Sequence, residues 1–365
     1  MSVAGTRVAI FLPSLRGGGA EHVMTLLANG FAARGLSVDL VLAEAAGPYL
    51  DDVARGVRVI DLKARRVVAS LPPLVSYLRR ERPAAMLSAL SHTNVVAITA
   101  RQLARVPTRL VVSERGVPMP DFIRSWKGRA IYKAMDLLYP RADHVISVSR
   151  YVSSALSRAI TISDDKLSVI YNPLPRPSAD ALAAHRPEHP FLSPAFTTII
   201  SVGRLDTVKA HDTLLTAISL SERRAQIRVL LLGEGPLKGS LQQLARSLEI
   251  DDLVDFVGFQ RHPLAWMAAA DLFVLSSVSD AMPNAMLQAM ACGLPIVSTD
   301  CGGPAEILEQ GRWGRLVPVN DPPALARAID LAIADPAPPD VRTRSRFFDA
   351  DRITDAYLQA LRVTP

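Results

Sequence analysis

The chain has 365 residues, and at about 100–200 residues per domain this length predicts two domains. Hydrophobic residues make up 49% of the sequence and charged residues 21%, which provides material for buried cores and argues against a disordered chain. The net charge of +6 is uneven: residues 1–172 carry 23 Lys and Arg against 13 Asp and Glu, whereas the remainder is mildly acidic. A basic half can face nucleic acid, a membrane surface or an anionic ligand, although solvated surface charge is the plainer alternative.

Metal sites, disulfides and membrane spans find little support in the sequence. Cys292 and Cys301 are too few for a disulfide scaffold or a four-thiolate zinc site, and they favour a reducing, cytoplasmic location. His185 and His189 bracket Pro187, so no helix aligns the two rings, and we expect no metal site. No apolar run reaches the roughly 18 residues of a spanning helix, and the N-terminal run is too short for a signal peptide.

Short apolar runs alternate with longer segments of helical period in the first half of the chain. This alternation predicts βαβ units and a parallel sheet covered by helices on both faces. The expected strands are 8–12, 36–42, 57–62, 85–90, 109–112, 144–148 and 167–171. The expected helices are 20–34, 71–82, 94–104, 124–139 and 149–159.

Six prolines between residues 172 and 194 interrupt this alternation, and we interpret 173–194 as a linker that disfavours helix and central strand. Strands are then expected at 197–202, 227–232, 254–258, 272–276 and 295–298, with helices at 210–221, 236–248, 263–269, 284–291, 304–310 and 352–361. We therefore predict domains over 1–172 and 195–345, and a C-terminal segment, 346–365, whose helix returns towards the first domain. Two doubly wound domains should leave a cleft at the carboxyl ends of their strands.

A glycine-rich turn follows the first expected strand. Gly17, Gly18 and Gly19 let the backbone approach a ligand closely, and the helix that begins there offers free amides to an anion. Glu21 lies in the first turn of that helix. His22 occupies the third glycine position of the dinucleotide fingerprint, which argues against NAD binding and leaves a plain tight turn as the alternative.

Two segments of the second half carry groups suited to a phosphorylated ligand. Arg204 follows a strand and Lys209 opens the next helix, and this pair suits a diphosphate unless both are ordinary surface cations. Further on, Asp280 precedes a helix that begins near Asn284, and Gln288 lies on its second turn. The methionines spaced four apart in this segment are more typical of a core stripe: Met282, Met286 and Met290.

The ordered set of motifs resembles the retaining glycosyltransferases of family 4 over nearly the whole chain. The matching segments are Gly-Gly-Gly-Ala-Glu at 17–21, Ile-Tyr-Asn-Pro at 170–173, Gly-Arg-Leu at 203–205 with Lys209, Leu-Gly-Glu-Gly-Pro-Leu at 232–237, Val-x-Phe-x-Gly-Phe read loosely at 254–259, and Pro-Asn-Ala-Met-Leu-x-Ala-Met-Ala-Cys-Gly-x-Pro at 283–295. The resemblance implies the α/β GT-B fold, in which two Rossmann-like, doubly wound parallel-sheet domains face a cleft.

The resemblance also implies a nucleotide-diphospho sugar as donor, with a UDP-sugar favoured and a GDP-sugar second, and neither cofactor nor metal. The residues implied for donor binding are Arg204 and Lys209 at the diphosphate, the amides of Asn284, Ala285 and Met286 beside it, Gly258 and Phe259 against the base, and Gly17, Gly18 and Gly19 over phosphate and sugar. Where the family has Glu-x7-Glu, this chain has Asp280, which the resemblance places in catalysis, and Gln288. Gln288 can still hydrogen-bond the ribose hydroxyls, without charge assistance.

The acceptor side is implied in the basic half. His92 opens a helix after a strand, where it is either a catalytic contact to donor or acceptor or a helix-capping histidine. The family places polar side chains at these strand ends, and the acceptor-side candidates are Glu21, Glu114 and Arg115. The resemblance implies that the anomeric configuration is retained without an established protein nucleophile. The leaving phosphate takes the proton of the acceptor hydroxyl, while the protein positions the substrates and stabilises the developing charge.

The resemblance implies a lipid-linked glycan acceptor, and an enzyme meets such an acceptor at a membrane surface. The segment 124–141 combines cations with aromatic and aliphatic residues at helical spacing, as helices lying on anionic bilayers do. The candidate membrane residues are Arg124, Trp126, Lys127, Arg129 and Lys133, and we expect a peripheral location on the inner face of the cell membrane. No nucleic-acid motif or aromatic platform accompanies the cations, so we expect no nucleic-acid binding. A degenerate sugar-binding subunit and a GT-B nucleotide-sugar epimerase are the alternatives.

Overall fold

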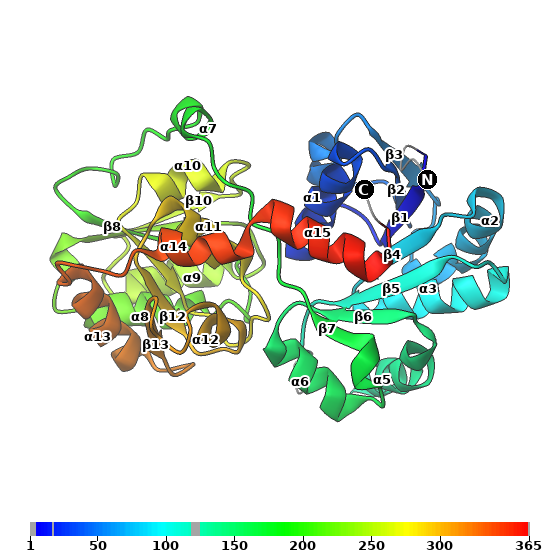
Figure 1. Cartoon of the computed structure of the whole chain (residues 1–365). Helices are drawn as coiled ribbons and strands as arrows, with labels where there is room; N and C mark the ends of the chain where they lie inside the picture. Colours follow the sequence, from blue (N-terminus) through cyan, green and yellow to red (C-terminus); the bar gives the residue numbers. More distant parts are fainter. Residues whose placement is uncertain (1–4, 17, 118–124, 364–365) are drawn as a thin grey trace. The chain divides into compact units, whose positions relative to one another are not determined.

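The structure is a computed structural model that describes residues 5–16, 18–117 and 125–363. The chain forms two compact units (Figure 1). Unit 1 comprises Met1–Pro173 together with Ala350–Pro365, and unit 2 comprises Leu174–Asp349. Each unit contains one parallel sheet with helices on both faces, so the doubly wound α/β architecture predicted from the sequence is confirmed.

The sheet of unit 1 has seven strands in the order β3-β2-β1-β4-β5-β6-β7. Its strands are β1 (Arg7–Leu12), β2 (Ser37–Leu42), β3 (Val57–Asp61), β4 (Ala85–Ala89), β5 (Arg109–Glu114), β6 (His144–Ser147) and β7 (Leu167–Val169). The helices are α1 (Gly19–Ala33), α2 (Leu71–Glu81), α3 (Ser91–Ala104), α5 (Trp126–Leu138), α6 (Arg150–Ala159) and α15 (Ala350–Leu361). Short 3-10 turns are η1 (Pro48–Asp52), η2 (Val67–Ser70), η3 (Tyr139–Arg141) and η4 (Asp164–Lys166).

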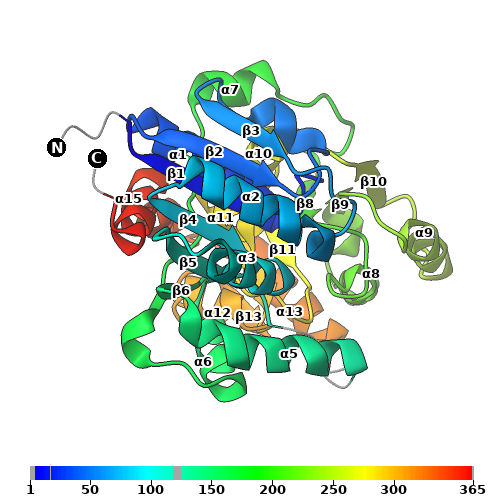
Figure 2. The same ribbon diagram turned by 90° about the vertical axis from the view of Figure 1, so that its right-hand side faces the viewer.

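Alternating side chains of these strands enter two separate cores, because successive residues of a strand point to opposite faces. Helices α1 and α15 cover one face, where Leu27, Phe31 and Tyr357 are buried against Ile10 and Leu12. Helices α2, α3, α5 and α6 cover the other face, and α2 and α3 lie in front of the strands in Figure 2. Strands buried on both faces need almost continuous apolar sequence, which explains why they were predictable.

Unit 2 repeats the plan with six strands in the order β10-β9-β8-β11-β12-β13. Its strands are β8 (Thr197–Val202), β9 (Ile227–Leu232), β10 (Val254–Gly258), β11 (Leu272–Leu275), β12 (Ile296–Thr299) and β13 (Arg315–Val317). Its helices are α7 (Ala179–Ala184), α8 (His211–Leu220), α9 (Lys238–Ser247), α10 (Pro263–Ala268), α11 (Asn284–Cys292), α12 (Gly303–Ile307), α13 (Pro322–Ile333) and α14 (Val341–Ser345), with 3-10 turns η5 (Arg224–Gln226) and η6 (Arg346–Phe348). Helices α8, α9 and α13 pack on one face of the sheet.

The order of strands reverses beside the first strand of each unit. In unit 1 the chain runs outward from β1 to β3 and then returns to the other side of β1 with β4; in unit 2, β8 and β11 flank the equivalent point. Ligands of open α/β sheets bind outside the carboxyl ends of the strands at such a switch point. The loops after β1, β4, β8 and β11 are therefore the expected ligand-binding positions.

The Pro-rich segment that we expected to be a linker belongs to unit 2 and contains helix α7. The backbone amide of Leu174 donates to the carbonyl of Phe348 at 2.8 Å, and the His189 ring is 2.8 Å from an Asp255 carboxylate oxygen. The expectation of no helix here was wrong because the prolines flank α7, whose own sequence is Ala-Asp-Ala-Leu-Ala-Ala and strongly favours a helix.

The last helix, α15, lies in unit 1, where it contacts α1, β4 and β5. Unit 1 is therefore assembled from two separate stretches of sequence, whereas unit 2 is continuous. In the described part of the chain, none of the helices combines the length and the hydropathy needed to cross a bilayer.

Candidate functional site

Three glycine-containing turns of unit 2 meet at the carboxyl ends of β8, β9 and β10. The amide of Gly203 donates to Leu232 at 2.9 Å, and the amide of Gly233 donates to Gly258 at 2.8 Å. A Cβ on Gly233 would overlap the carbonyl oxygen of Gly203, and its φ of 143° also favours glycine. The Gly-containing motifs, which are separate in the sequence, therefore contact one another in the fold. Together these turns form a glycine layer that holds the backbone of Arg204 at the end of β8.

Lys209 forms an ion pair with Asp280, with Nζ 2.5 Å from Oδ2. The side chain of Lys209 is 24% exposed, whereas that of the neighbouring Arg204 is 71% exposed. Backbone contacts hold the lysine in place, since the Asp206 carboxylate accepts from its amide and the Ser276 hydroxyl donates to its carbonyl. Two cations of different exposure thus lie beside the switch point of unit 2, and each has a carboxylate partner: Asp280 for Lys209, and Asp206, at 3.8 Å, for Arg204.

Asp280 also connects two loops of the backbone. Its amide donates to the carbonyl of Cys301 at 3.2 Å, and its carbonyl accepts from the amide of Gly303 at 2.8 Å. Its other carboxylate oxygen accepts from the amide of Met282. The carboxylate that we expected in catalysis is therefore held between the β11 loop, the start of α12 and Lys209.

Helix α11 presents its first turns beside this ion pair. Met286 and Met290 are fully buried, which confirms the predicted core stripe. Gln288 lies on the second turn and is half-buried, as are Asn284 and Ala285. One expectation needs correction: the Met286 amide donates to the carbonyl of Pro283 at 3.1 Å, because the first turn is tight, and so it is engaged within the helix terminus.

The turn after β10 carries the residues expected against a nucleobase. Gly258 has a φ of 84°, and a Cβ there would crowd the carboxylate of Glu234. Phe259 follows it with about half of its surface exposed. An exposed ring at a strand end can stack on a flat ligand.

His211 was not selected from the sequence, yet it is buried two residues after Lys209 at the start of α8. Burial, and secondarily the Lys209 cation, lowers the pKa of His211 to about 4. Its Nδ1 has no hydrogen-bond partner within the described residues. The sequence around it, Lys-Ala-His-Asp, does not distinguish a buried histidine from an exposed one, so its burial could not be predicted.

In unit 1, Gly18 precedes α1 and is covered by the side chain of Glu21. A Cβ on Gly18 would overlap the Glu21 carboxylate, so a larger residue at this position would require the Glu21 side chain to move. Gly17 lies outside the described residues, and Gly19 is the first residue of α1. His92 is exposed as the second residue of α3, on the other side of the switch point.

Glu114 and Arg115, the acceptor-side candidates at the end of β5, are both held by other residues of unit 1. The buried Glu114 carboxylate accepts from the Ser91 hydroxyl at 2.7 Å and from the Tyr139 hydroxyl at 2.6 Å. Burial raises the pKa of Glu114 above its ordinary value, although these two hydrogen bonds oppose the shift. Arg115 donates to the Asn172 amide oxygen at 2.6 Å, which assigns a structural contact to the Ile-Tyr-Asn-Pro motif.

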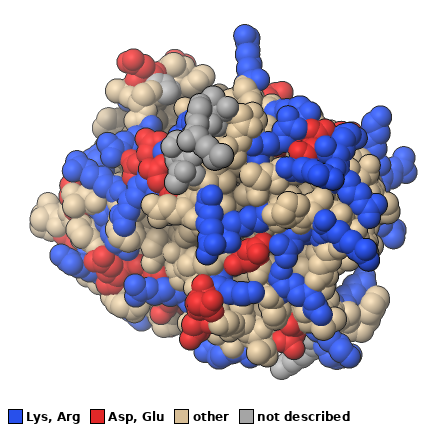
Figure 3. Space-filling view, turned by 45° about the vertical axis from the view of Figure 1, so that its right-hand side comes forward, with Lys and Arg blue, Asp and Glu red and all other residues tan. Residues whose placement is uncertain are grey.

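Helix α5 divides sharply into two faces. Met135 is buried in the core, whereas Trp126 and Leu137 are 70% and 62% exposed. The cations of this helix, Lys127, Arg129 and Lys133, are exposed as well, and Arg124 lies outside the described residues. Lys and Arg side chains outnumber acidic ones on the face of the molecule drawn in Figure 3.

Two family descriptions match the chain. "Glycosyl transferase 4-like domain" matches residues 18–173, and "Glycosyl transferases group 1" matches residues 197–335. The first match lies within unit 1 and begins after β1, and the second lies within unit 2. Both contain the strand-end segments described above.

Two relatives align over nearly their whole length. One is the N-acetylgalactosamine-N,N'-diacetylbacillosaminyl-diphospho-undecaprenol 4-alpha-N-acetylgalactosaminyltransferase of Campylobacter jejuni, 26% identical over 97% of this chain and 99% of that protein. Another is the lipopolysaccharide core biosynthesis glycosyltransferase LpsE of Rhizobium meliloti, 28% identical over 95% of this chain and 97% of that protein.

Solved structures share the fold. The Anabaena protein HepE in complex with UDP-glucose has a TM-score of 0.83 at 21% identity and covers 98% of this chain and all of that one. WaaG, a glycosyltransferase involved in lipopolysaccharide biosynthesis, has a TM-score of 0.74 at 15% identity, over 98% and 99% of the two chains.

Proposed function

The chain belongs to the family 4 glycosyltransferases with the GT-B fold, and from this premise we propose that it is a retaining enzyme that moves a sugar from a UDP-sugar to a lipid-linked glycan. A hexosamine is the first choice for the transferred sugar, and a GDP-hexose is the second choice of donor. The glycosyltransferases that resemble it act in surface glycan biosynthesis, and we place this chain in the same process.

The observation that carries the proposal is the pair of cations at the switch point of unit 2. Lys209 is oriented by Asp280, and Arg204 extends from the glycine layer with its guanidinium largely exposed. A guanidinium and an ammonium together can bind both phosphates of a nucleotide diphosphate. Phe259 offers a ring surface to the base of either nucleotide, and UDP is favoured because HepE, of the same fold, was solved with UDP-glucose.

The chemical role that we assign to these residues is charge stabilisation. As the bond from the sugar to the diphosphate breaks, negative charge develops on the leaving oxygen, and fixed cations lower the energy of that state. The leaving phosphate then accepts the proton of the attacking hydroxyl on the same face of the sugar. Cations supplied by the protein can serve in place of a divalent metal, and we propose that the reaction needs none.

We further propose that the enzyme meets its acceptor at the inner face of the cell membrane. The Campylobacter relative is named for an acceptor on diphospho-undecaprenol, which is a membrane lipid. The exposed Trp126 and Leu137, with the cations of α5 around them, have the composition of a helix face that lies in an anionic bilayer interface. Peripheral binding of this kind keeps the catalytic unit in the cytoplasm.

One rival function is favoured by a specific observation. Asp280 and Gln288 stand where the family resemblance leads us to expect two glutamates, and a subunit that binds a sugar but turns it over poorly would tolerate such changes. The ion pair of Asp280 with Lys209 favours the active enzyme, because it keeps the shorter carboxylate engaged. An epimerase of the same fold is disfavoured by the α5 surface, since its substrate needs no membrane.

The experiment that tests the proposal begins with thermal shift measurements on a panel of nucleotide sugars, because a ligand that binds only the folded state raises Tm. Donors that raise Tm are then assayed for transfer and for slow hydrolysis to the nucleoside diphosphate. UDP-sugar turnover supports the enzyme. Stabilisation without any turnover would favour the degenerate subunit, and interconversion of two nucleotide sugars would favour the epimerase.

Lys209→Ala should weaken UDP binding by about 1.5–3 kcal/mol, because a charge-assisted contact is lost. Arg204→Ala should weaken it in the same direction. Arg327→Ala, which removes an exposed cation from α13, is the matched control and should leave affinity unchanged. Isothermal calorimetry with UDP measures all three, and equal affinities for wild type, Lys209→Ala and Arg204→Ala would remove both cations from the donor site.

A further inference from the structure

Helices α11 and α12 both begin beside Asp280. Helix α11 starts at Asn284, and the amide of Gly303, the first residue of α12, donates to the Asp280 carbonyl at 2.8 Å. A Cβ on Gly303 would overlap the carbonyl of Ala281, so α12 starts in close contact with the backbone of this loop. The first turns of both helices therefore lie near the Lys209–Asp280 pair, which we propose for donor binding.

The opposite ends of the two helices meet one further element, the short helix α14. Helix α14 contacts α11 within unit 2 (Figure 1), and it carries Arg342 and Arg344. The Arg342 guanidinium donates to the carbonyl of Cys292, the last residue of α11. The Arg344 guanidinium donates to the carbonyl of Ile307, the last residue of α12, at 2.9 Å, and to that of Glu306 at 3.3 Å. Helix α14 thus joins the C-terminal ends of both helices.

Arg342 contacts α11 exactly where a helix needs outside partners. The last four carbonyls of an α-helix have no partner within the helix, and they carry partial negative charge that a nearby cation stabilises. At the end of α11 the amide of Gly293 donates to the carbonyl of Met290 at 3.0 Å. A Cβ on Gly293 would overlap the Arg342 guanidinium, so a larger residue there would require the arginine to move. The guanidinium therefore lies directly against the end of α11.

Arg344 is held by side chains as well as by the end of α12. Its side chain is only 11% exposed, and one of its nitrogens is 3.0 Å from a carboxylate oxygen of Glu309. The ring of Phe348, which is fully buried, has its centre 5.0 Å from the guanidinium carbon. Val341 of the same helix is buried too. Helix α14 is therefore anchored in unit 2 and can hold the two helix ends in place.

We propose that Arg342 and Arg344 are positioning residues for the donor site. Each holds the far end of a helix whose first turn lies near the Lys209–Asp280 pair. Helix α11 is only about 12 Å long at 1.5 Å per residue, and its Met290 is fully buried, so the helix moves as one rigid element. Release of its C-terminal end should therefore loosen its first turn as well.

The inference rests on the proposed function, because it assumes that a nucleotide-sugar donor binds beside Asp280. It deepens that function by naming residues that act on donor binding through two helices. The alternative is a purely local role, in which loss of Arg342 frees the last turn of α11 and leaves the first turn unchanged. The two roles differ at the first turn of α11, and the experiments measure that turn.

Hydrogen exchange followed by mass spectrometry measures the first turn without any ligand. The amides of Met286 and Leu287 donate to the carbonyl of Pro283 at 3.1 Å and 3.2 Å, so their exchange reports whether this turn is intact. In Arg342→Ala we expect exchange in residues 283–287 to be faster by roughly threefold or more. Faster exchange confined to residues 289–294 would overturn the proposal, because it would show a purely local role.

Two further variants serve as controls for the exchange measurement. Arg342→Lys keeps a cation that can donate to the last carbonyls of α11 and should restore most of the protection. Arg346→Ala removes an exposed arginine from the neighbouring turn η6 and should leave exchange in α11 unchanged. Equal acceleration in Arg342→Ala and Arg346→Ala would contradict a specific role of Arg342.

Isothermal calorimetry with UDP tests the consequence for the donor site. Arg342→Ala and Arg344→Ala should each weaken UDP binding by about three- to tenfold, Arg342→Lys should restore most of the affinity, and Arg346→Ala should not change it. If Arg344→Ala does not fold, because its side chain is buried, Arg342→Ala at its exposed position carries the test. In assays of turnover, the KM for the donor should rise while the KM for the acceptor stays the same.

The outcomes separate this inference from the proposed function. Wild-type affinity for UDP in Arg342→Ala and Arg344→Ala would contradict the positioning role and leave the proposed enzyme standing. Failure of the wild type to bind any nucleotide sugar would contradict the proposed function, and exchange in residues 283–287 of Arg342→Ala would still decide whether α14 controls the first turn of α11.

Discussion

At the scale of single residues, the Lys209–Asp280 ion pair fixes the position of one of the two cations that we propose for the donor site of unit 2. A lysine side chain has four rotatable bonds, and the contact at 2.5 Å restricts its ammonium before any ligand arrives. A diphosphate would then join a lysine that is already oriented, while Asp280 continues to offset part of its charge. The ordering of the side chain is thus completed during folding, which favours binding because less entropy is lost on association.

Gln288→Glu should raise the affinity for UDP-sugars up to about fivefold, because hydrogen bonds to a charged acceptor are stronger by up to about 1 kcal/mol than those to a neutral one. Competition binding with a fluorescent UDP analogue provides the measurement. Gln242→Glu on the exposed side of α9 adds the same charge elsewhere and should have no effect. A large loss of affinity in Gln288→Glu would show that the amide N–H of Gln288 makes a contact that a carboxylate cannot.

His211 makes unit 2 sensitive to acid. Its pKa is about 4 in the folded chain and near 6.5 when exposed, so between these values the unfolded state binds a proton that the folded state does not. The free energy of unfolding therefore falls as pH drops from 6.5 towards 4, by about 3 kcal/mol in total from this one group.

His211→Asn should remove most of that dependence. Between pH 7 and pH 5 the variant should lose about 2 kcal/mol less stability than the wild type, as measured by urea denaturation at both pH values. His185→Asn removes a histidine at an exposed position and serves as the control. A pH dependence in His211→Asn equal to that of the wild type would mean that the buried ring is not the group that titrates.

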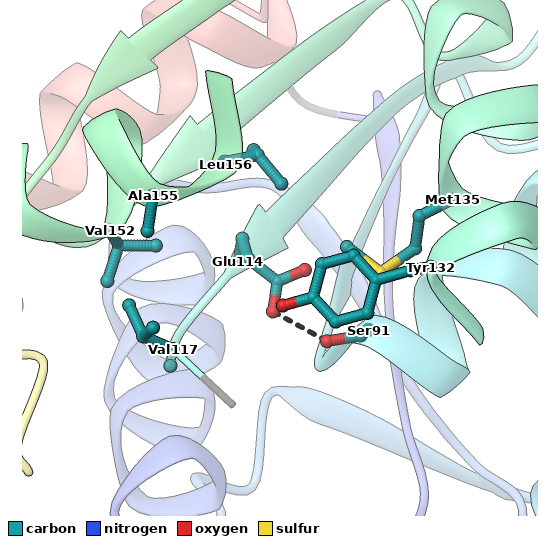
Figure 4. Close-up of a pocket in the computed structure, with 9 residues that line it drawn as sticks. Ser91, Glu114, Val117, Tyr132, Met135, Val152, Ala155 and Leu156 are labelled. Atoms are coloured by element: carbon teal, nitrogen blue, oxygen red, sulfur yellow. Dashed lines mark hydrogen bonds between the residues drawn. The ribbon is translucent and has the colours of Figure 1, made fainter. Parts of the chain in front are cut away.

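At the scale of elements, α5 shows how one helix can take part in two interactions. Its inner face packs Met135 and Tyr132 against the core (Figure 4), while its outer face exposes Trp126, Leu137 and the cations. Because side chains three and four positions apart share a face of a helix, both surfaces persist over its whole length.

Reversing the three cations of this helix, Lys127→Glu, Arg129→Glu and Lys133→Glu together, should lower binding to anionic vesicles by about 100-fold or more at low salt, since each cation adds about 1 kcal/mol. Co-sedimentation with phosphatidylglycerol vesicles at low and high salt checks this. Reversal of three exposed arginines of unit 2, Arg224, Arg246 and Arg327, is the control of equal charge. Wild-type binding that responds to neither lipid charge nor salt would contradict the electrostatic surface.

Helices and strands were predictable from the sequence where a local pattern of residues determines the structure. They were not predictable where contacts between residues distant in the sequence determine it. The buried strands β1, β2 and β8–β11 were found nearly to the residue, because their apolar runs have no other stable placement. Strand β13 and helices α13 and α14 were missed: β13 has only three residues, and α14 is short and rich in arginine. Of the candidate site, Arg204 and Lys209 stood out by charge and position, but the pairing of Lys209 with Asp280 joins residues 71 apart and leaves no local signal.

At the scale of the whole molecule, unit 1 is divided between both ends of the sequence, and its core includes side chains of the C-terminal helix α15. Tyr357 of α15 is fully buried in the core shared with α1, and its hydroxyl is 3.5 Å from Arg115. Because α15 contributes a large buried aromatic ring to this core, the stability of the core depends on α15. We therefore expect unit 1 to be the part of the chain that responds to changes near the C-terminus.

Tyr357→Ala should destabilise unit 1 by about 3–5 kcal/mol, as expected for removal of a buried aromatic side chain. Hydrogen exchange followed by mass spectrometry should show faster exchange in β1, β4 and β5, with the strands of unit 2 unchanged. Leu331→Ala, at an exposed position of α13, should change protection in neither unit. Equal loss of protection in both units would show that they unfold as one.

Because unit 1 is built from both ends of the sequence, its two parts are synthesised at different times, with all of unit 2 between them. Unit 2 is one uninterrupted stretch whose two ends are joined by the hydrogen bond from Leu174 to Phe348, so it can fold as soon as it leaves the ribosome. Unit 1 emerges first but must wait for all of unit 2 before α15 arrives, a delay of about ten seconds or more at typical elongation rates. During that interval one side of its sheet carries an uncovered apolar strip, and the nascent chain is then most exposed to chaperones and to aggregation.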